Sequence, residues 1–393
     1  MNRRSRALAR CFTLTLLALP APAQSTSLEV RFYPERSLYL HPLEDQRGIE
    51  SALLQNAAVI NRGTSPLTLE SLTFELLAGE AAIQTERLQG DVLTGLGARS
   101  GQLAASGMLE LFAFHFRPDL LLAGAAPSGG TTLAPGAALL LGHRAFLIQE
   151  TAINALRLSA VARATAGERV EGRAELAIVR RPPTAGYTFP LAGTWFVGAG
   201  ASLHSHHRWA VPEEFALDLL RVGENGRTFR GDGKRLDDYL AWEAPVRAVA
   251  DGTVVRVVDR FEDGKVLRRE PGEAPQVYLA RVQQAQVTLF AEGPDAITGN
   301  AVVLEHANGE FSFYAHLRRG SVGVKVGDRV KRGQVIGKLG NSGNSTEPHL
   351  HVHVTNGPDP LRCAGLPVAF EGIELPIADL PRALQTGDVV IAE

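Results

Sequence analysis

The sequence predicts a mainly β chain with two domains. Apolar residues make up 45% of its 393 residues, which is enough for each domain to bury a core. Short stretches in the first half alternate apolar and polar residues, and short apolar runs in the second half are separated by Asp-Gly and Asn-Gly turns. We therefore expect an amino-terminal β-sandwich of the immunoglobulin-like kind, followed by an all-β domain.

Residues 1–23 have the pattern of a secretory signal peptide. Arginines up to Arg10 precede an apolar run from Cys11 to Leu19, and Ala21-Pro22-Ala23 fits a small-residue cleavage site. The run is too short to span a bilayer. We expect an exported protein, located in the periplasm or cell envelope or secreted, with no integral membrane segment after cleavage. Only Cys363 would then remain, so the mature chain would form no internal disulfide.

Residues 24–180 form the predicted sandwich domain. Leu28, Val30 and Phe32 alternate with charged residues, and similar alternation continues to a last strand at Arg173 to Arg180. The Gly- and Leu-rich part from Val92 to Leu122 is compatible with helix or loop. The sequence leaves three roles open for this domain: a spacer, a wall- or partner-binding module, or a cover for a cleft.

Residues 181–189 are the predicted linker, because Pro182, Pro183 and Gly186 stand where the alternation stops. Residues 190–393 form the second predicted domain. Its clearest hairpin joins Ala301–Glu305 to Phe311–Tyr314 through an Asn-Gly turn. A charged insert from Arg260 to Gln286 interrupts the strands, and we expect it to form a loop or hairpin beside a binding groove.

Charge and histidine content indicate which classes of partner and chemistry the chain is suited to. Lys plus Arg number 40 and Asp plus Glu number 42, so the net charge of −2 argues against a nucleic-acid partner. Of the 11 histidines, all but His41, His115 and His143 lie at or beyond His204. Histidine is a common zinc ligand and proton carrier near neutral pH, so we expect the chemistry in the second domain.

A histidine-rich strand and an isolated acid are the candidate site residues. On a strand, His349, His351 and His353 share one face because side chains alternate. Asp218 lies in a mainly apolar run, where an acid is costly unless it is paired or bound to metal. A hydrolytic zinc site needs about three protein ligands and one open position.

Several motifs follow one another from about Phe215 to Val354: the strand-turn-strand Ala244–Val254, Gly299–Val303, Tyr314-Ala315-His316-Leu317, Gly327–Gly337, and Gly340–Ser345 leading into Pro348-His349-Leu350-His351. In this order they resemble the lysostaphin-like or LytM-type zinc metallopeptidases of the bacterial cell wall.

The resemblance implies roles for individual residues. Asp218 and His351 would bind Zn²⁺. His349 would lie beside the metal-bound water and transfer protons, and His316 would orient the water or stabilise the oxyanion. The substrate would be the stem or cross-link peptides of peptidoglycan, cleaved by a zinc metalloendopeptidase.

One position departs from the family pattern. Glu214 stands four residues before Asp218, where the family has a zinc-binding histidine. We favour His207 as the third ligand, with His206 second and Glu214 third. The other interpretation is a broken metal site in an inactive LytM-like domain that binds the cell wall or activates separate amidases, with a cell-envelope protein as its partner.

His353 shares the catalytic face, so it is expected to line the cleft or hydrogen-bond a ligand, without a catalytic role. Asn300 and Thr346 are expected to border the cleft.

Overall fold

A computed structural model describes residues 27–35, 37–43, 48–149, 152–376 and 383–393 of the chain. The predicted signal peptide, 1–23, lies outside these residues. Strands account for 41% and helices for 17% of the structure, which confirms the mainly β prediction. Among the described residues, no helix combines the length and the apolar character needed to cross a membrane.

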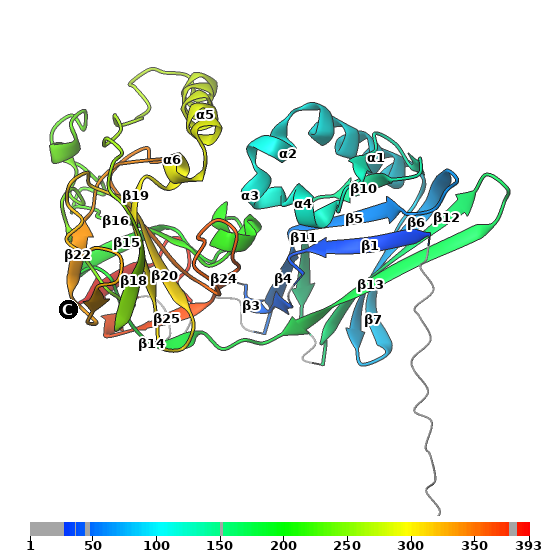
Figure 1. The fold of residues 1–393 in the computed structure, drawn as a ribbon. Helices are drawn as coiled ribbons and strands as arrows, with labels where there is room; N and C mark the ends of the chain where they lie inside the picture. The colour runs from blue at the N-terminus through cyan, green and yellow to red at the C-terminus, as the bar shows by residue number, and fades with distance from the viewer. Residues whose placement is uncertain (1–26, 36, 44–47, 150–151, 377–382) are drawn as a thin grey trace, which may run out of the picture.

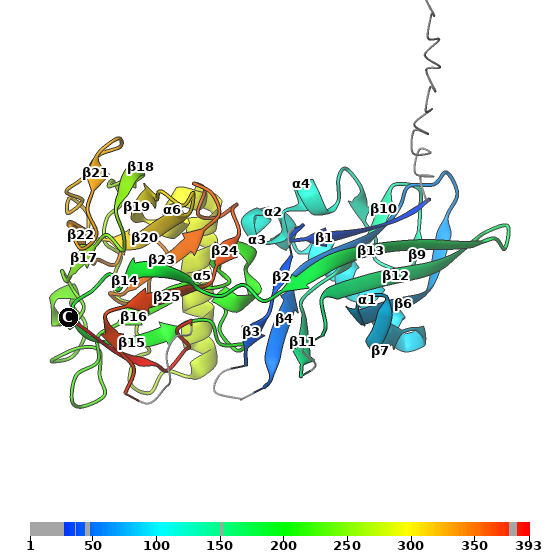
Figure 2. The ribbon, with the colours of Figure 1, turned by 90° about the horizontal axis from the view of Figure 1, so that it is seen from below.

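The first half is a sandwich of sheets around one apolar core (Figures 1 and 2). Leu28, Leu72 and Leu158 lie in this core and are fully buried. A side chain at Gly172 would collide with the backbone of Leu28, so this glycine allows the two main sheets to approach closely. One sheet has the order β1 (Leu28–Tyr33), β5 (Asn56–Asn61), β10 (Ala137–Leu141), β8 (Ala126–Pro127). The other has β2 (Leu38–Tyr39), β13 (Arg169–Val179), β12 (Ala155–Ala164), β6 (Leu67–Ala78), β7 (Ala81–Leu88), with β9 (Thr132–Leu133) beside β6.

Helices cover the outer face of the smaller sheet. Ala57 and Val59 of β5 face the sandwich core, whereas Ala58 and Ile60 face a second cluster that contains residues of the helices. Residues 92–122, whose sequence is compatible with helix or loop, are mainly helical. A third small sheet completes this half with β11 (Arg144–Ile148), β4 (Glu50–Leu54) and β3 (His41–Pro42). The helices are α1 (Gly90–Ala105), α2 (Met108–Leu111), α3 (Ala113–Phe116) and α4 (Pro118–Leu121).

The second half is built on one large sheet, and its core includes Trp195, Tyr314 and Val352. The predicted hairpin is present as β19 and β20. The order is β21 (Arg329–Val330), β18 (Gly252–Val258), β19 (Asn300–Glu305), β20 (Phe311–Leu317), β23 (Leu350–Thr355), β16 (Leu217–Leu220), β15 (Gly193–Ala199), β27 (Val389–Ala392), β26 (Ile373–Glu374), with β24 (Gly365–Leu366) on β23. A separate pair joins β17 (Pro245–Arg247) to β22 (Val335–Lys338).

Two segments differ from the sequence expectations. Part of the predicted linker forms β14 (Thr184–Thr188), which pairs with β25 (Val368–Glu371), and Tyr187 is buried in the core of the second half. The charged insert, residues 260–286, is a loop up to Ala274, as expected, but not after it. It continues into α5 (Pro275–Glu292) and α6 (Pro294–Thr298). No residue of α5 is buried, so its sequence carries no clear apolar face that would have predicted the helix.

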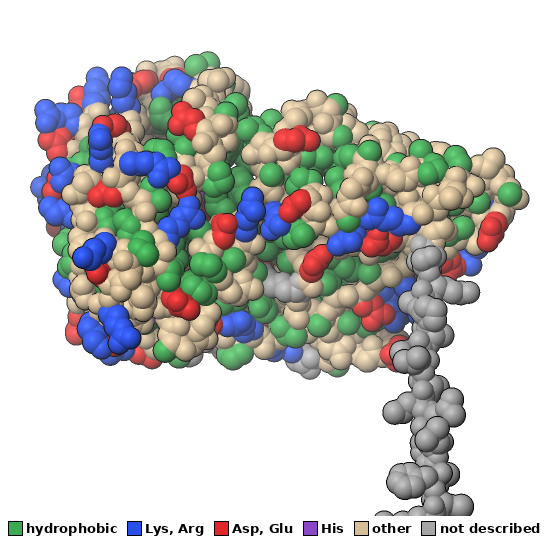
Figure 3. Space-filling view, viewed as in Figure 1, with side chains coloured by type: hydrophobic (Ala, Val, Ile, Leu, Met, Phe, Trp, Pro, Cys, Tyr) green, Lys and Arg blue, Asp and Glu red, His purple; other side chains and the backbone are tan. Residues whose placement is uncertain are grey.

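The two halves share part of their core. Val211 and Ala364 of the second half belong to the same buried cluster as Tyr33, Leu109 and Leu140 of the first. Above this contact, hydrophobic side chains line a notch between the two halves (Figure 3). Helices α2 and α3 lie on one side of the notch, and α5 lies on the other (Figure 1).

Candidate active site

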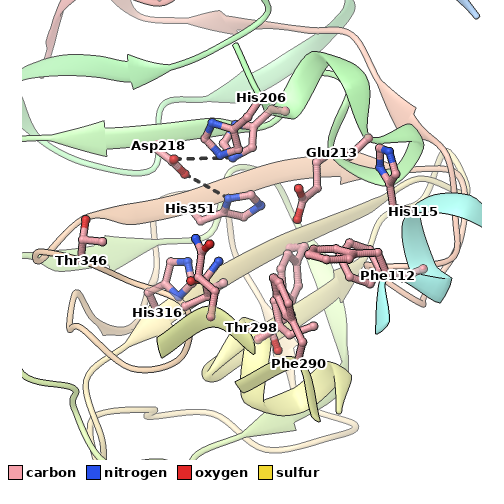
Figure 4. Close-up of a pocket in the computed structure, with 18 of the residues that line it drawn as sticks. Phe112, His115, His206, Glu213, Asp218, Phe290, Thr298, His316, Thr346 and His351 are labelled. Carbon is pink, nitrogen blue, oxygen red and sulfur yellow. Dashed lines mark hydrogen bonds and ion pairs between the residues drawn. The ribbon is translucent and has the colours of Figure 1, made fainter. Parts of the chain in front are cut away.

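A pocket of about 590 Å³ lies where the two halves meet. All five residues predicted for the metal site and its chemistry line it: His207, Asp218, His316, His349 and His351. Figure 4 shows Asp218, His316 and His351 in this pocket. The first half contributes apolar and aromatic side chains to the same pocket, among them Phe112 and His115.

Asp218 and His351 are brought together by the sheet. They lie directly opposite each other on the paired strands β16 and β23, and His351 Nδ1 is 3.0 Å from Asp218 Oδ1. Burial opposes the charge on Asp218, but His207 and His349 outweigh it and hold the pKa of the carboxyl well below its usual range. The carboxylate is therefore ionised at neutral pH.

His207 approaches Asp218 from the short 3-10 turn η1 (His207–Trp209). Its Nε2 lies 3.5 Å from Asp218 Oδ2, and its Nδ1 lies 3.3 Å from the carbonyl oxygen of Ala216, to which it donates. This hydrogen bond orients the ring, as outer contacts of metal-binding histidines commonly do. Burial lowers the pKa of His207 to about 3, so the imidazole is neutral and able to act as a ligand.

The other two ligand options differ from each other. Glu214 is buried and forms an ion pair with Arg208, and it does not line the pocket. His206 is exposed and its ring lies 4.1 Å from that of His207. Ligand atoms of His206, His207 and Asp218 all lie within 4.8 Å of one another. His206 thus remains an alternative to His207, whereas the Arg208 pair accounts for Glu214.

The donor set suits zinc. Two imidazoles and one carboxylate are a common ligand set of hydrolytic zinc sites. Tetrahedral ligands at 2.0–2.1 Å from a zinc ion lie about 3.3 Å apart. His351 Nδ1 lies 3.0 Å from Asp218 Oδ1, and His207 Nε2 lies 3.5 Å from the other carboxylate oxygen, Oδ2, so each pair has a separation of this size.

His349 lies near Oδ1 of Asp218, whereas His207 lies near Oδ2. Its Nε2 is 3.5 Å from Asp218 Oδ1, and its Nδ1 donates to the carbonyl oxygen of Glu347 at 2.9 Å. Burial works against protonation, but Asp218 outweighs it, so the pKa of His349 is raised.

His316 has the opposite shift. Burial and the neighbouring His349 and His351 hold its pKa well below the usual range. Its Nδ1 donates to the carbonyl oxygen of Ser342 at 2.8 Å, and its ring centre is 4.7 Å from that of His349. Titratable groups whose surroundings move their pKa values apart are typical of acid and base partners.

The backbone of His316 is also unusual. Its φ of 60° is in the left-handed region, which non-glycine residues rarely adopt. Such conformations cost roughly 1–3 kcal/mol and concentrate at functional sites. Gly340 N–H donates to the His316 carbonyl oxygen at 3.0 Å, which helps hold this conformation.

Three further residues lie around the site. His353, expected to line the cleft or hydrogen-bond a ligand, has its Nδ1 3.0 Å from His351 Nε2 and is buried, so it orients a predicted ligand. The alternation of His349, His351 and His353 along the strand is the sequence signal that points to this contact. Asn300 does not border the cleft, because it is buried and bonds the backbone of Phe261 and Leu317. Thr346 does line the pocket, as expected.

The aromatic side of the pocket could not be predicted from sequence. Phe112 and Phe114 of the first half pack against Phe290 of α5. Their ring centres lie 4.6 and 6.1 Å, respectively, from the centre of the Phe290 ring. His115 lies nearby, with its Nε2 3.0 Å from Nε2 of His143. No local motif links these residues, because the contacts join distant parts of the chain.

A β-sheet domain with an imidazole and carboxylate cluster in a pocket has the donor types that hydrolytic metal sites use. Comparison with known families agrees: residues 281–363 match the model of Peptidase family M23, which confirms the expected resemblance over that segment. The segment includes His316, His349 and His351. His207 and Asp218 precede it.

Curated relatives match over short segments. The chain is 37% identical over 110 residues to the DD-carboxypeptidase/endopeptidase Mpg of Neisseria meningitidis, which covers 28% of this chain and 23% of that protein. It is 51% identical over 60 residues to the peptidoglycan DD-endopeptidase ShyC of Vibrio cholerae, which covers 15% of this chain and 13% of that protein. The matched segments thus span a quarter or less of these relatives.

Among solved structures, the lysostaphin catalytic domain of Staphylococcus simulans has a TM-score of 0.24 and 19% identity, covering 44% of this chain and 88% of that one. The M23 metalloprotease pseudoalterin has a TM-score of 0.27 and 14% identity, covering 50% and 84%.

Proposed function

We propose that the second half of the chain is a zinc metalloendopeptidase that hydrolyses peptide amides in bacterial peptidoglycan. The observation that carries the proposal is the convergence of His207, Asp218, His316, His349 and His351 on one pocket. The match to Peptidase family M23 and the names of the Neisseria and Vibrio relatives support the substrate class.

His207, Asp218 and His351 would hold the metal, with His206 as the alternative to His207. Zinc at this position would act as a Lewis acid and lower the pKa of water toward 7. His353 keeps the His351 ring in place through the contact between their ring nitrogens. The ionised Asp218 carboxylate supplies the negative charge that balances part of the charge of the cation.

His349 and His316 handle the remaining charge and protons. Each donates from Nδ1 to a backbone carbonyl, of Glu347 and Ser342 respectively, which orients the ring and leaves Nε2 for chemistry in the pocket. His349 would transfer protons between the attacking water and the departing amine nitrogen. His316 would orient that water or stabilise the developing oxyanion.

An inactive binding or activating module was suggested by Glu214 alone. In this chain Glu214 has a partner in Arg208, and His207 lies beside Asp218. A decayed site has no physical reason to keep five polar side chains directed at one pocket, so the hydrolase is the better proposal.

The direct experiment is the zinc content of the purified protein, measured by elemental mass spectrometry together with digestion of isolated peptidoglycan. We expect about one zinc per chain, and its loss in Asp218→Ala and His351→Ala. The matched control is His204→Ala, which removes an exposed histidine from the same loop as His207 and should keep the metal. Absence of zinc after reconstitution, or zinc without cleavage of any cell-wall peptide, would contradict the proposal.

We also propose that the chain is exported, on the basis of the signal-like pattern of residues 1–23 and of a substrate located in the cell envelope. Sequencing of the mature amino terminus should find it near Gln24. A mature protein that keeps Met1 would contradict export through this segment.

A further inference from the structure

The three candidate ligands are held in two different ways. Asp218 and His351 lie on strands that pair directly, so the sheet fixes their separation. His207 lies on a three-residue turn whose backbone bonds are local, such as Ala210 N–H to the His207 carbonyl oxygen at 3.0 Å. A turn of this kind is weakly held by itself, so something else must set the position of the third ligand.

Arg208, the residue after His207, supplies that connection. Its side chain is completely buried. Its Nε donates to the Ala201 carbonyl oxygen at 3.1 Å, and its Nη1 pairs with the Glu214 carboxylate. Its guanidinium carbon lies 5.0 Å from the centre of the Phe215 ring. Since Glu214 and Phe215 lead into the strand that carries Asp218, Arg208 ties the turn of one ligand to the strand of another.

The same guanidinium reaches the other half of the molecule. Arg208 Nη2 donates to Ser51 Oγ on β4 at 3.4 Å, and the Ser51 hydroxyl in turn donates to the His41 carbonyl oxygen at 3.3 Å. Both Arg208 and Ser51 are buried, so neither contact is exposed to competition from bulk water.

Neighbouring residues make further contacts with the first half. The Trp209 ring centre lies 5.2 Å from that of His143. Val211 is buried in the cluster that includes Tyr33 and Leu140. The segment that follows His207 is therefore packed against the first half at successive positions.

We propose that the first half is a structural part of the zinc site, and that Arg208 is the positioning residue through which it fixes His207. This inference rests on the proposed function. It also explains why Glu214 stands where the family has a zinc-binding histidine. The Glu214 carboxylate holds Arg208 in place, and Arg208 in turn holds the turn that carries His207, the replacement ligand. A ligand turn ordered before the metal binds loses less conformational freedom on binding, which raises affinity.

The test measures zinc affinity by competition with a chromogenic chelator in Arg208→Lys, Ser51→Ala and the full-length wild-type chain. Lysine keeps the charge but loses the fork of donors, so we expect affinity to fall roughly 10- to 100-fold. Ser51→Ala leaves the pair with Glu214 intact and should lower affinity about 3-fold. The matched control is Arg181→Lys, in an ion pair with Glu310 that lies outside the pocket, and its affinity should equal that of the wild type.

A second measurement does not depend on the metal. Hydrogen exchange of the zinc-free proteins should be faster at the amides of Arg208 and Trp209 in Arg208→Lys than in the wild type, and unchanged at Leu219 and Leu350 in the sheet. This pattern separates a loosened turn from general destabilisation.

The outcomes distinguish the two proposals. If the wild type binds zinc and both Arg208→Lys and Ser51→Ala bind it equally well, positioning by the first half is overturned while the proposed function stands. If Arg208→Lys does not fold, Ser51→Ala decides the question by itself, because it removes only one hydroxyl group. A wild-type chain that binds no zinc overturns the proposed function and this inference together.

Discussion

At the scale of single residues, the pocket histidines are oriented by contacts away from the pocket. Nδ1 of His207, His316 and His349 each donates to a backbone carbonyl, so in all three rings Nε2 is the nitrogen left for the pocket. His351 is the reverse case, because its Nδ1 faces Asp218 and its Nε2 contacts His353. Such contacts fix the tautomer, on which both metal binding and proton transfer depend.

This difference predicts different losses for two neighbouring histidines. His351→Ala should lose zinc and activity together. His349→Ala should keep zinc but lower kcat by roughly 10²- to 10⁴-fold, the usual contribution of a proton-transferring group. Zinc content and kcat on a purified cross-linked muropeptide would be measured for both variants. Full activity in either one would remove that residue from the site.

A pH effect is expected from His115. Burial, together with the adjacent His143, lowers the pKa of His115 to about 4 in the folded chain, against about 6.5 when unfolded. Between these values the unfolded chain binds more protons, so the free energy of unfolding should fall as pH drops from about 6.5 to about 4.

For one such proton the slope is at most about 1.4 kcal/mol per pH unit. In His115→Gln the free energy of unfolding should fall less steeply than in the wild type between about pH 6.5 and about pH 4. Urea denaturation at several pH values measures this slope. The control His204→Gln changes an exposed histidine and should leave the wild-type slope. Equal slopes in all three proteins would contradict a neutral His115 in the folded chain.

At the scale of elements, the sequence predicted what the sheet determines and missed what tertiary contacts determine. Alternation placed His349 and His351 on one strand face, and the register of β16 with β23 then brought Asp218 to His351. The choice between His206 and His207 depends on a 3-10 turn whose position is set by buried neighbours, so periodicity carries no information on it. Helix α5 was missed because no residue of it is buried.

Helix α5 should influence substrate binding through one ring. Phe290 lines the pocket and packs edge-on against Phe112. Phe290→Ala removes this apolar wall, so we expect KM for a muropeptide to rise a few-fold, with zinc content unchanged. Val287→Ala is the matched control, because Val287 is an exposed apolar residue of the same helix that does not line the pocket. A lower KM in Phe290→Ala would instead mean that the ring contact obstructs entry.

At the scale of the whole molecule, the two halves are joined through buried groups rather than through a linker alone. Val211 and Ala364 share a core with residues of the first half, and His41 of β3 lies 2.9 Å from the side-chain nitrogen of Gln385. The sequence predicted a boundary at residues 181–189, from the prolines and the glycine that stand where the alternation stops. The shared core was not, since its residues come from distant segments that look like ordinary strand and turn positions.

The shared core predicts that the two halves unfold together. All three tryptophans, Trp195, Trp209 and Trp242, belong to the second half. Since the Trp209 ring lies against His143 of the first half, the measurement uses a Trp209→Phe background, in which Trp195 and Trp242 report on the second half. Leu158→Ala truncates a fully buried side chain in the core of the first half, which should cost about 2–5 kcal/mol. If unfolding is cooperative, the fluorescence midpoint in urea should fall although no tryptophan lies near the substitution.

The control is Leu147→Ala, at a half-exposed site in the first half, which should leave the fluorescence midpoint unchanged. An unchanged fluorescence midpoint in Leu158→Ala, together with a lowered midpoint by circular dichroism, would mean that the halves unfold separately, and it would weaken the case for a zinc site that depends on both.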